Sequence, residues 1–296
     1  MMFRYLYIII LSISFSSCDH YSEEKENLEL SKEFKNYWYS GEAEITSYEL
    51  KQARYGEIRD GEAVLIYVTE DFLPEEQVKA AKKDDENISV LKLNATKNFN
   101  TGIYPYSIMQ SSFYPLNGEA HTLKLSASIQ EWCGQVYMQL NNHEKFEIES
   151  HSYFAGEADE ELELNKVHLE NEFWNRIRID HESLPTGEFM VLPTLEYLRL
   201  SHNKVKTYKA IGEYYISDEF NVYQLTYPEL NRKLKIYYSR IFPFSIEKWE
   251  ESYPSSSGNN VEILTTIAVK KERLRTDYWN KNSNKNLPLR QKLDLK

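Results

Sequence analysis

Residues 41–70 read GEAEITSYELKQARYGEIRDGEAVLIYVTE, and this stretch decides the expected fold. Its two ends, 41–49 and 63–70, are rich in β-branched and aromatic residues and predict two strands. Between them, residues 54–61 contain the pair Asp60-Gly61, and an Asp-Gly pair between apolar runs is a strong signal for a tight hairpin turn. The stretch therefore predicts an antiparallel hairpin with its turn in the segment that contains this pair.

Similar runs follow along the chain. Strands are predicted at 87–93, 121–128, 130–140, 145–154, 174–180, 188–192, 196–200, 207–216, 222–227, 233–239 and 261–270. Helices are fewer: we expect short ones at 28–38 and at 74–83, where Pro74 suits the first helical turn. The acidic residues 156–172 predict a loop followed by a short helix, and residues 255–260 predict a loop.

The composition agrees with a sheet. The 296 residues include 23 Tyr, and aromatic residues make up 14% of the chain. Tyr suits a half-buried pleated surface because its ring is apolar and its tip is polar. Many short strands with few Gly and Pro predict a mainly β fold. We expect a large curved antiparallel sheet, a half-barrel or a sandwich with a few short helices.

The first residues have the features of a bacterial secretory leader. Arg4 is followed by an apolar run at 5–11, which is shorter than the roughly 20 residues of a membrane-spanning helix. Residues 15–18 (FSSC) then place small side chains directly before a cysteine. This arrangement resembles the lipobox of bacterial lipoproteins, which implies that residues 1–17 are a cleaved signal peptide and that Cys18 is lipidated. A secretory signal with an unrelated cysteine and an uncleaved anchor are the alternatives.

All three alternatives place the rest of the chain outside the cytoplasm. We expect residues 18–35 to form a lipidated acidic tether, and lipid on Cys18 to be the membrane attachment. The expected location is the cell envelope, at the outer membrane, on its periplasmic or its surface face.

The rest of the chain divides into a body and a tail. We expect a β-rich body at 36–275, with two strand-rich halves that meet near 155–175, and a polar C-terminal tail at 276–296 that lies loosely on the surface. Once Cys18 carries lipid, Cys133 is the only remaining thiol, so the fold must hold without an intramolecular disulfide.

Charge and motifs exclude several classes of function. Removal of residues 1–17 takes away one charged residue, Arg4, and changes the formal net charge from −11 to −12. Binding to nucleic acid needs clustered Lys and Arg, so we expect no nucleic-acid partner. The chain also has no GxSxG, no phosphate-binding Gly loop and no dinucleotide fingerprint.

The segment 130–140 (QEWCGQVYMQL) is the most distinctive candidate for a site. If it forms one strand, its side chains alternate between two faces. The expected core face carries Trp132, Val136, Met138 and Leu140, and the other face carries Cys133 with Glu131, Gln135, Tyr137 and Gln139. We expect the last four residues to face a ligand. An ordinary solvated sheet face would have the same pattern.

Cys133 is a candidate nucleophile. A histidine would have to lower the pKa of its thiol or act as its base. The candidate partners are His121, His143 and His151, with Glu131 to orient one of them. No CxxC pair surrounds Cys133, and a lone cysteine in a strand also serves as a small packed side chain.

We expect no metal and no cofactor. The seven histidines are scattered, and no pair of them has the i, i+4 spacing of a zinc-protease helix. The acidic run at 157–161 lacks the ligand spacing and the turn glycine of an EF-hand, and is typical of a solvated loop.

Three segments carry a family resemblance: 39–45 (YSGEAEI), 100–109 (NTGIYPYSIM) and 130–134 (QEWCG). Together they resemble a family of Bacteroidota envelope lipoproteins of about this length, over nearly the whole mature chain. Members of that family often carry the label "septum formation inhibitor Maf". Maf proteins proper are cytoplasmic nucleotide pyrophosphatases with a Ser- and Arg-rich motif near the N-terminus. This chain has a leader and an acidic tether there, so the label does not imply that activity.

The function we expect is that of a non-enzymatic envelope lipoprotein. It would present a curved, aromatic-rich sheet to a lipid, a small molecule or an envelope-protein partner. The alternative is an envelope hydrolase or transferase that uses Cys133 with a nearby histidine. A nucleotide pyrophosphatase has the least support, because a location outside the cytoplasm removes the nucleotide pool that such an enzyme would act on.

Overall fold

One mostly antiparallel sheet of 16 strands dominates the computed structural model, which describes residues 28–258 and 260–295. The strands are β1 (Ala43–Arg54), β2 (Glu57–Leu73), β3 (Val78–Lys79), β4 (Ile88–Thr101), β5 (Tyr104–Pro115), β6 (Lys124–Glu131), β7 (Gly134–Asn142), β8 (Phe146–Ser152), β9 (Glu160–Leu164), β10 (His168–Leu169), β11 (Gly187–Leu192), β12 (Tyr208–Ser217), β13 (Phe220–Tyr227), β14 (Arg232–Ser239), β15 (Ile246–Ser257) and β16 (Asn260–Thr276). The α-helices are α1 (Lys32–Trp38), α2 (Glu170–Ile179), α3 (Leu195–Leu200) and α4 (Pro288–Lys292). The expected fold class is confirmed.

The strand order shows that the sheet curls back on itself. Its first strand, β1, lies in the middle, paired with β2 on one side and with β16 on the other. The strands run outward from there to two edge strands, β9 and β10. Only residues 165–167 join β9 to β10, and so short a link spans at most about 14 Å. The two edges of the sheet therefore lie near each other at this point.

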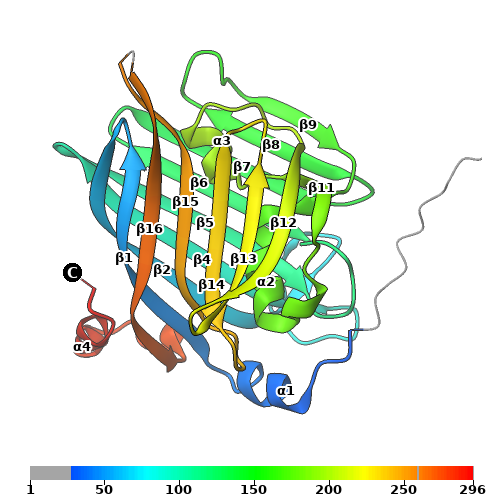
Figure 1. Cartoon of the computed structure of the whole chain (residues 1–296). Helices are drawn as coiled ribbons and strands as arrows, with labels where there is room; N and C mark the ends of the chain where they lie inside the picture. The colour runs from blue at the N-terminus through cyan, green and yellow to red at the C-terminus, as the bar shows by residue number, and fades with distance from the viewer. Residues whose placement is uncertain (1–27, 259, 296) are drawn as a thin grey trace, which may run out of the picture.

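No backbone pairing joins the two edges within the described residues. We call this unpaired line between β9 and β10–β11 the seam. Figure 1 shows the result: strands β12–β15 form a front wall and strands β4–β7 a rear wall, with α2 and α3 in the same region. The sheet is therefore a curled, open structure rather than a flat one.

Helix α2 contacts both walls. The Asn175 amide donates to the Leu91 carbonyl at 2.7 Å and accepts from the Ser112 hydroxyl at 2.7 Å, both on the rear wall. On the opposite side, Trp174 packs edge-on against Trp249 of β15, with ring centroids 5.4 Å apart. Helix α2 therefore fills the space between the walls.

Helix α3 fills a second part of this space. The Glu196 carboxylate accepts from Lys97 at 2.8 Å and from Gln110 at 2.7 Å, on β4 and β5. The neighbouring Tyr197 packs against Tyr253 of β15, with ring centroids 5.8 Å apart. One hydrophobic cluster consequently includes residues from both strand-rich halves, which share a single core.

Buried ion pairs fasten α2 to the front wall and to β1. Arg178 makes a two-pronged pair with Glu44 at 2.9 Å, and both side chains are 1% exposed. Arg232 pairs with Glu170 at 2.5–2.6 Å and with Glu251 at 2.7 Å. A charge buried this deeply is tolerated only with its partner in place, so these pairs determine where α2 can sit.

The first hairpin turns five residues earlier than the Asp60-Gly61 pair indicates. Its turn is Tyr55-Gly56, where φ is 55° and 75°, as a two-residue hairpin with positive φ requires. Asp60 and Gly61 lie inside β2. An added Cβ at Gly61 would lie 2.4 Å from the Asn98 carbonyl oxygen, so this glycine allows a close approach of β4 rather than a turn.

Two predicted strands, 174–180 and 196–200, are wrong because both segments lie in helices. In α2, Phe173 and Ile177 are four residues apart and both fully buried, which is the spacing of a helical face. In α3, the Thr194 hydroxyl caps the first turn by accepting a backbone N–H at 3.2 Å. Short apolar segments of this kind fit either periodicity, and contacts with both walls select the helix.

The predicted helix at 74–83 is also wrong. The segment is a turn followed by β3, which pairs with the end of β2. Gln77 takes a positive φ of 57°, and its side chain donates to the Pro74 carbonyl at 2.8 Å. Pairing with β2, whose Phe72 is 1% exposed, outweighs the local preference for helix.

Other boundaries differ as well. Strands β5, β9 and β15 were not predicted, and β9 occupies part of the segment expected to be a loop and a helix at 156–172. The loop expected at 255–260 is mostly strand, since β15 runs to Ser257 and β16 starts at Asn260. These strands carry many polar residues, because one of their faces is open to solvent.

The C-terminal segment at 276–296 is packed rather than loose. It contains α4, and the following Leu293 is only 6% exposed. The Leu293 carbonyl accepts from the Ser47 hydroxyl of β1 at 2.5 Å, and Asp294 pairs with Lys271 at 2.7 Å. At the other end, the expected signal peptide at 1–17 and the lipidation residue Cys18 lie outside the described residues.

Replacing Glu44 by Gln should lower the free energy of unfolding by about 3–5 kcal/mol at pH 7, because the buried Arg178 loses its counter-charge. Burial alone would raise the pKa of Glu44, but the Arg178 charge outweighs it and holds the pKa below the usual 4.5. The stabilisation is therefore present above pH 4.5 and is lost as the pH falls below it. We expect the free energies of unfolding of the wild type and the variant, measured with urea, to approach each other as the pH is lowered from 7 to about 3.5.

The matched control is Glu229→Gln, which breaks the exposed pair of Glu229 with Lys206. This change should lower the free energy of unfolding by less than about 1 kcal/mol at every pH. A Glu44→Gln effect as small as that of the control, or one that does not change with pH, would contradict the assigned role of the buried pair.

Candidate ligand-binding site

Cys133 lies at the tip of a hairpin rather than in the middle of a strand. Trp132 and Cys133 form the turn between β6 and β7, and both are exposed. The Cys133 backbone N–H donates to the Glu131 carboxylate at 2.7 Å. A hydrogen bond between the Cys133 side chain and Glu131 raises the pKa of the thiol. A catalytic thiol needs the opposite shift.

The structure does not bring the three candidate histidines to Cys133. His143 pairs with Glu147 beyond the far end of β7, a strand that spans about 26 Å. His121 precedes β6 at the same far end and contacts Glu172. His151 lies opposite Tyr137, about 13 Å along β7 from Cys133. His151 also faces a carboxylate, Asp159, at 3.4 Å.

The predicted alternation along 130–140 holds only for β7. Val136, Met138 and Leu140 are at most 2% exposed, as expected of a core face. Trp132 was expected on the same face, but it is 68% exposed because the hairpin turn interrupts the alternation before it reaches this residue. The proposed ligand-facing residues Gln135, Tyr137 and Gln139 lie on the opposite, outer face of β7, and Glu131 ends β6. The Tyr137 hydroxyl donates to Gln139 at 2.8 Å.

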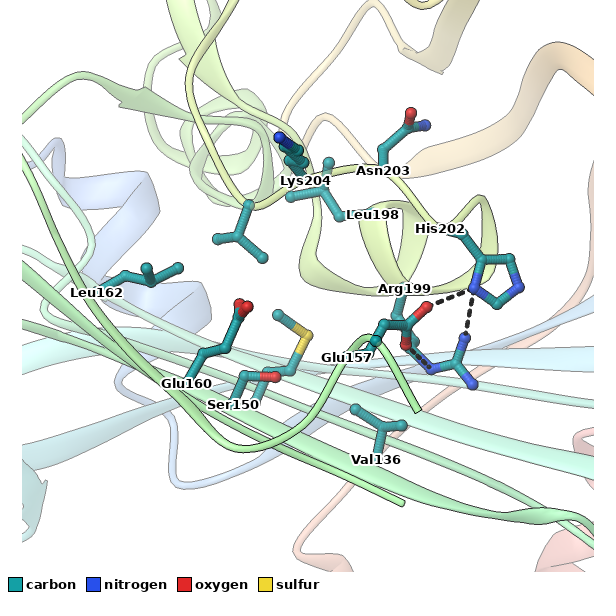
Figure 2. Close-up of a pocket in the computed structure, with 13 residues that line it drawn as sticks. Val136, Ser150, Glu157, Glu160, Leu162, Leu198, Arg199, His202, Asn203 and Lys204 are labelled. Atoms are coloured by element: carbon teal, nitrogen blue, oxygen red, sulfur yellow. Dashed lines mark hydrogen bonds and ion pairs between the residues drawn. The ribbon is translucent and has the colours of Figure 1, made fainter. Parts of the chain in front are cut away.

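The inner face of β7 borders a cavity of about 360 Å³ at the seam. We call it the seam pocket. Its lining comes from Val136, Met138, Ser150, Gly156, Glu157, Glu160, Leu162, Leu198, Arg199, His202, Asn203, Lys204 and Val205. Figure 2 shows the segments of β7–β9 below and the turn after α3 above. The pocket therefore lies between the last strands of the rear wall and the helix that fills the core.

Apolar side chains from both sides make the floor of the seam pocket. Val136 and Met138 come from β7, Leu162 from β9, and Leu198 from α3. Val205 adds a further apolar group from the turn that precedes β12. Such a surface accepts an apolar portion of a ligand, and the volume lies in the range of small-molecule sites.

One side of the rim is a fixed ionic cluster. Glu157 pairs with Arg199 at 3.3 Å and also accepts a hydrogen bond from His202 (Figure 2). The Arg199 guanidinium stacks over the Phe154 ring at 4.4 Å, and its side chain is only 7% exposed. These contacts hold the 154–157 segment against the C-terminal end of α3, so interactions within the protein fix this side of the pocket.

The other side of the rim carries two opposite charges, Glu160 and Lys204. Neither side chain forms an ion pair with any residue in the described part of the chain. In Figure 2 they stand on opposite sides of the opening, with the Glu160 carboxylate directed into the space. A ligand with both a cationic and an anionic group could pair with each of them.

A second cavity lies between the walls, beside α2 and α3. It has a volume of only about 50 Å³ and is bordered by Trp174, Trp249, Glu170, Glu196 and Glu251. A space of this size holds one or two water molecules and is far too small for an acyl chain. The interior therefore offers no room for a lipid at this place.

Sequence reasoning missed the seam pocket because its lining comes from segments far apart in the chain. It identified Val136 and Met138 as core-facing, which places them on the correct side of β7. It treated 157–161 as a solvated loop, although Glu157 and Glu160 border the pocket. No local spacing indicates that these residues meet the turn after α3.

Comparison of the chain with protein-family models, with curated proteins and with solved structures finds no match. Within the described residues, no helix combines the length and the apolar character that crossing a membrane requires. The site must therefore be interpreted from its own geometry.

Replacing Glu131 by Gln should increase the rate at which iodoacetamide alkylates Cys133 at neutral pH. The variant removes the carboxylate that raises the pKa of the thiol, so a larger fraction is thiolate. The control is Glu161→Gln, an exposed carboxylate on β9 that should leave the rate unchanged. Equal rates in the wild type and in Glu131→Gln would contradict the assigned role of Glu131.

Proposed function

We propose that this protein is a lipid-anchored lipoprotein of the cell envelope, and that its body is a non-enzymatic binding module whose ligand occupies the seam pocket. Attachment through Cys18, at the outer membrane, is proposed from the leader and the FSSC sequence that precedes the folded body. The observation that carries the binding role is a cavity of about 360 Å³ with an apolar floor and two opposite unpaired charges at its rim.

The lining favours a small zwitterionic ligand with an apolar portion, such as an amino acid or the end of a peptide. The apolar portion would contact Met138 and Leu162, an ammonium group would pair with Glu160, and a carboxylate with Lys204. Charge-assisted hydrogen bonds of this kind orient a ligand, while the apolar floor contributes most of the contact area.

Two observations support binding over the alternatives. The cavity between the walls is too small for an acyl chain, which disfavours lipid carriage in the core. Cys133 has a raised pKa and stands apart from the histidines proposed as its base, which disfavours a thiol hydrolase. A protein partner remains compatible with the proposal if the partner inserts a chain end into the pocket.

The full chain, extracted in detergent, should bind members of a panel of amino acids and dipeptides. Lys204→Gln should weaken binding of the best ligand about tenfold, since it removes one charge-assisted contact. Isothermal titration measures the affinity, and mass spectrometry of co-purifying molecules identifies further ligands.

The matched control is Lys209→Gln, which changes an exposed lysine of β12 that pairs with Glu188 away from the pocket. The Lys209→Gln variant should bind the best ligand with the affinity of the wild type. If Lys204→Gln and Lys209→Gln bind equally well, or if no member of the panel binds, the seam pocket is not the site of a zwitterionic ligand.

Replacing Cys18 by Ser should leave the protein without its acyl chains. The variant should leave the membrane fraction or accumulate with its leader attached, and metabolic labelling with a fatty-acid analogue should find no lipid on it. The control is Cys133→Ser, which should stay lipidated and membrane-bound. Lipid still attached to Cys18→Ser would contradict the proposed anchor.

A further inference from the structure

Three metal-ligating side chains meet at the point where the chain crosses the seam. They are His121 from the connection between β5 and β6, His168 from β10 and Glu172 from the first turn of α2. One potential ligand atom from each residue lies within 4.8 Å of the others. This cluster is separate from the seam pocket and shares none of its lining residues.

The distances fit ligands of one cation better than they fit strong hydrogen bonds. His121 Nδ1 lies 3.3 Å from Glu172 Oε2, and His168 Nδ1 lies 3.2 Å from Glu172 Oε1. A good N–H···O bond has its atoms about 2.9 Å apart. In a tetrahedral zinc site, bonds of about 2.0–2.2 Å put neighbouring ligand atoms about 3.3 Å from each other. The two distances, each to a different oxygen of Glu172, are long for hydrogen bonds and match the separation of neighbouring ligand atoms around one ion.

The cluster is also largely shielded from water. The Glu172 side chain is 0% exposed, that of His121 is 9% and that of His168 is 31%. Aromatic rings hold both imidazoles: Phe146 lies 5.6 Å from His121, and Phe189 lies 5.3 Å from His168. These ring contacts restrict the orientations of the two imidazoles, which lowers the entropic penalty of binding.

Thr122 adds a further polar group beside the cluster. Its backbone N–H donates to Glu172 Oε2 at 3.4 Å, which helps to orient the carboxylate as outer-shell groups do in metal sites. Its buried hydroxyl has no hydrogen-bond partner among the described residues.

We propose that His121, His168 and Glu172 bind one divalent cation, and that Zn²⁺ fits this ligand set best. Two imidazoles and a carboxylate are a known combination for Zn²⁺, with water in the fourth position. The cation would fasten the β5–β6 connection of the rear wall to β10 and α2, and so would hold the β10 edge and the start of α2 against the rear wall. Cys133 is the only cysteine in the described part of the chain, so a disulfide cannot do this.

The test is to strip the full chain with EDTA and to add back ZnCl₂ or CoCl₂. We expect one metal per chain by elemental analysis, an increase in melting temperature of about 5 °C at saturating Zn²⁺, and a tetrahedral visible spectrum with Co²⁺. The His168→Ala variant should bind no metal, show no rise in melting temperature with Zn²⁺ and give no tetrahedral Co²⁺ spectrum. The matched control is His143→Ala, since His143 also pairs with a glutamate four residues later, but on the surface. This variant should behave as the wild type.

A wild-type chain that takes up no metal would overturn the proposal, and so would His168→Ala binding metal as the wild type does. If His168→Ala does not fold, NMR of the cadmium-loaded wild type decides instead. Couplings from cadmium to the Nδ1 atoms of two histidines, assigned to His121 and His168, support the site. Couplings to other histidines, or none, contradict it.

Discussion

The whole structure depends on how α2 is held inside the curled sheet. A sheet this wide has an apolar inner face that must be buried. Helices α2 and α3 fill the space between the two walls, and together with the walls they form one hydrophobic core. Helix α2 brings charged side chains into that space, and each needs its partner. The Arg232–Glu170 and Arg178–Glu44 pairs meet this need, so they specify one position of the helix as well as contributing to packing.

The seam follows from the same arrangement. The chain passes from one edge of the sheet to the other through residues 165–167 and then enters α2. The edges approach each other without pairing, so the ends of the rear wall are covered by α3 and its following turn instead. Because no backbone hydrogen bonds close this gap, side chains border it, and their packing leaves room for a pocket. The proposed ligand site borders the β9 edge, and the proposed metal site includes His168 of the β10 edge.

The sequence indicated strands well where one face is consistently apolar, and poorly elsewhere. Val222 and Leu225 belong to a strand recognised almost in full, because both of its faces carry apolar residues. The sequence predicts a loop at strand β9 (EELEL), because the acidic outer face of the strand hides the apolar one. It predicts strands where helices α2 and α3 form, because segments of six to ten residues carry too few turns for the helical period to stand out.

Only one side of the candidate site could be predicted from the sequence. The alternation at Val136 and Met138 correctly identified the inner face of β7, one border of the seam pocket. Leu198 and Lys204, which line the opposite side of the pocket, lie some 60 residues further along the chain. His121 and Glu172 are likewise brought together over 51 residues. No spacing rule connects positions so far apart, because the distance between them depends on the path of the whole sheet.

What the sequence by itself determined is the mainly β fold class, the inner and outer faces of β7, and a body without a disulfide. These properties follow from side-chain type and from the two-residue period of a strand, which are local. The tertiary structure alone decided that the sheet curls into two walls, that two short apolar segments become helices, and that a pocket and a histidine–glutamate cluster form at the seam. Those features depend on contacts between distant segments, where burial and charge pairing outweigh local preference.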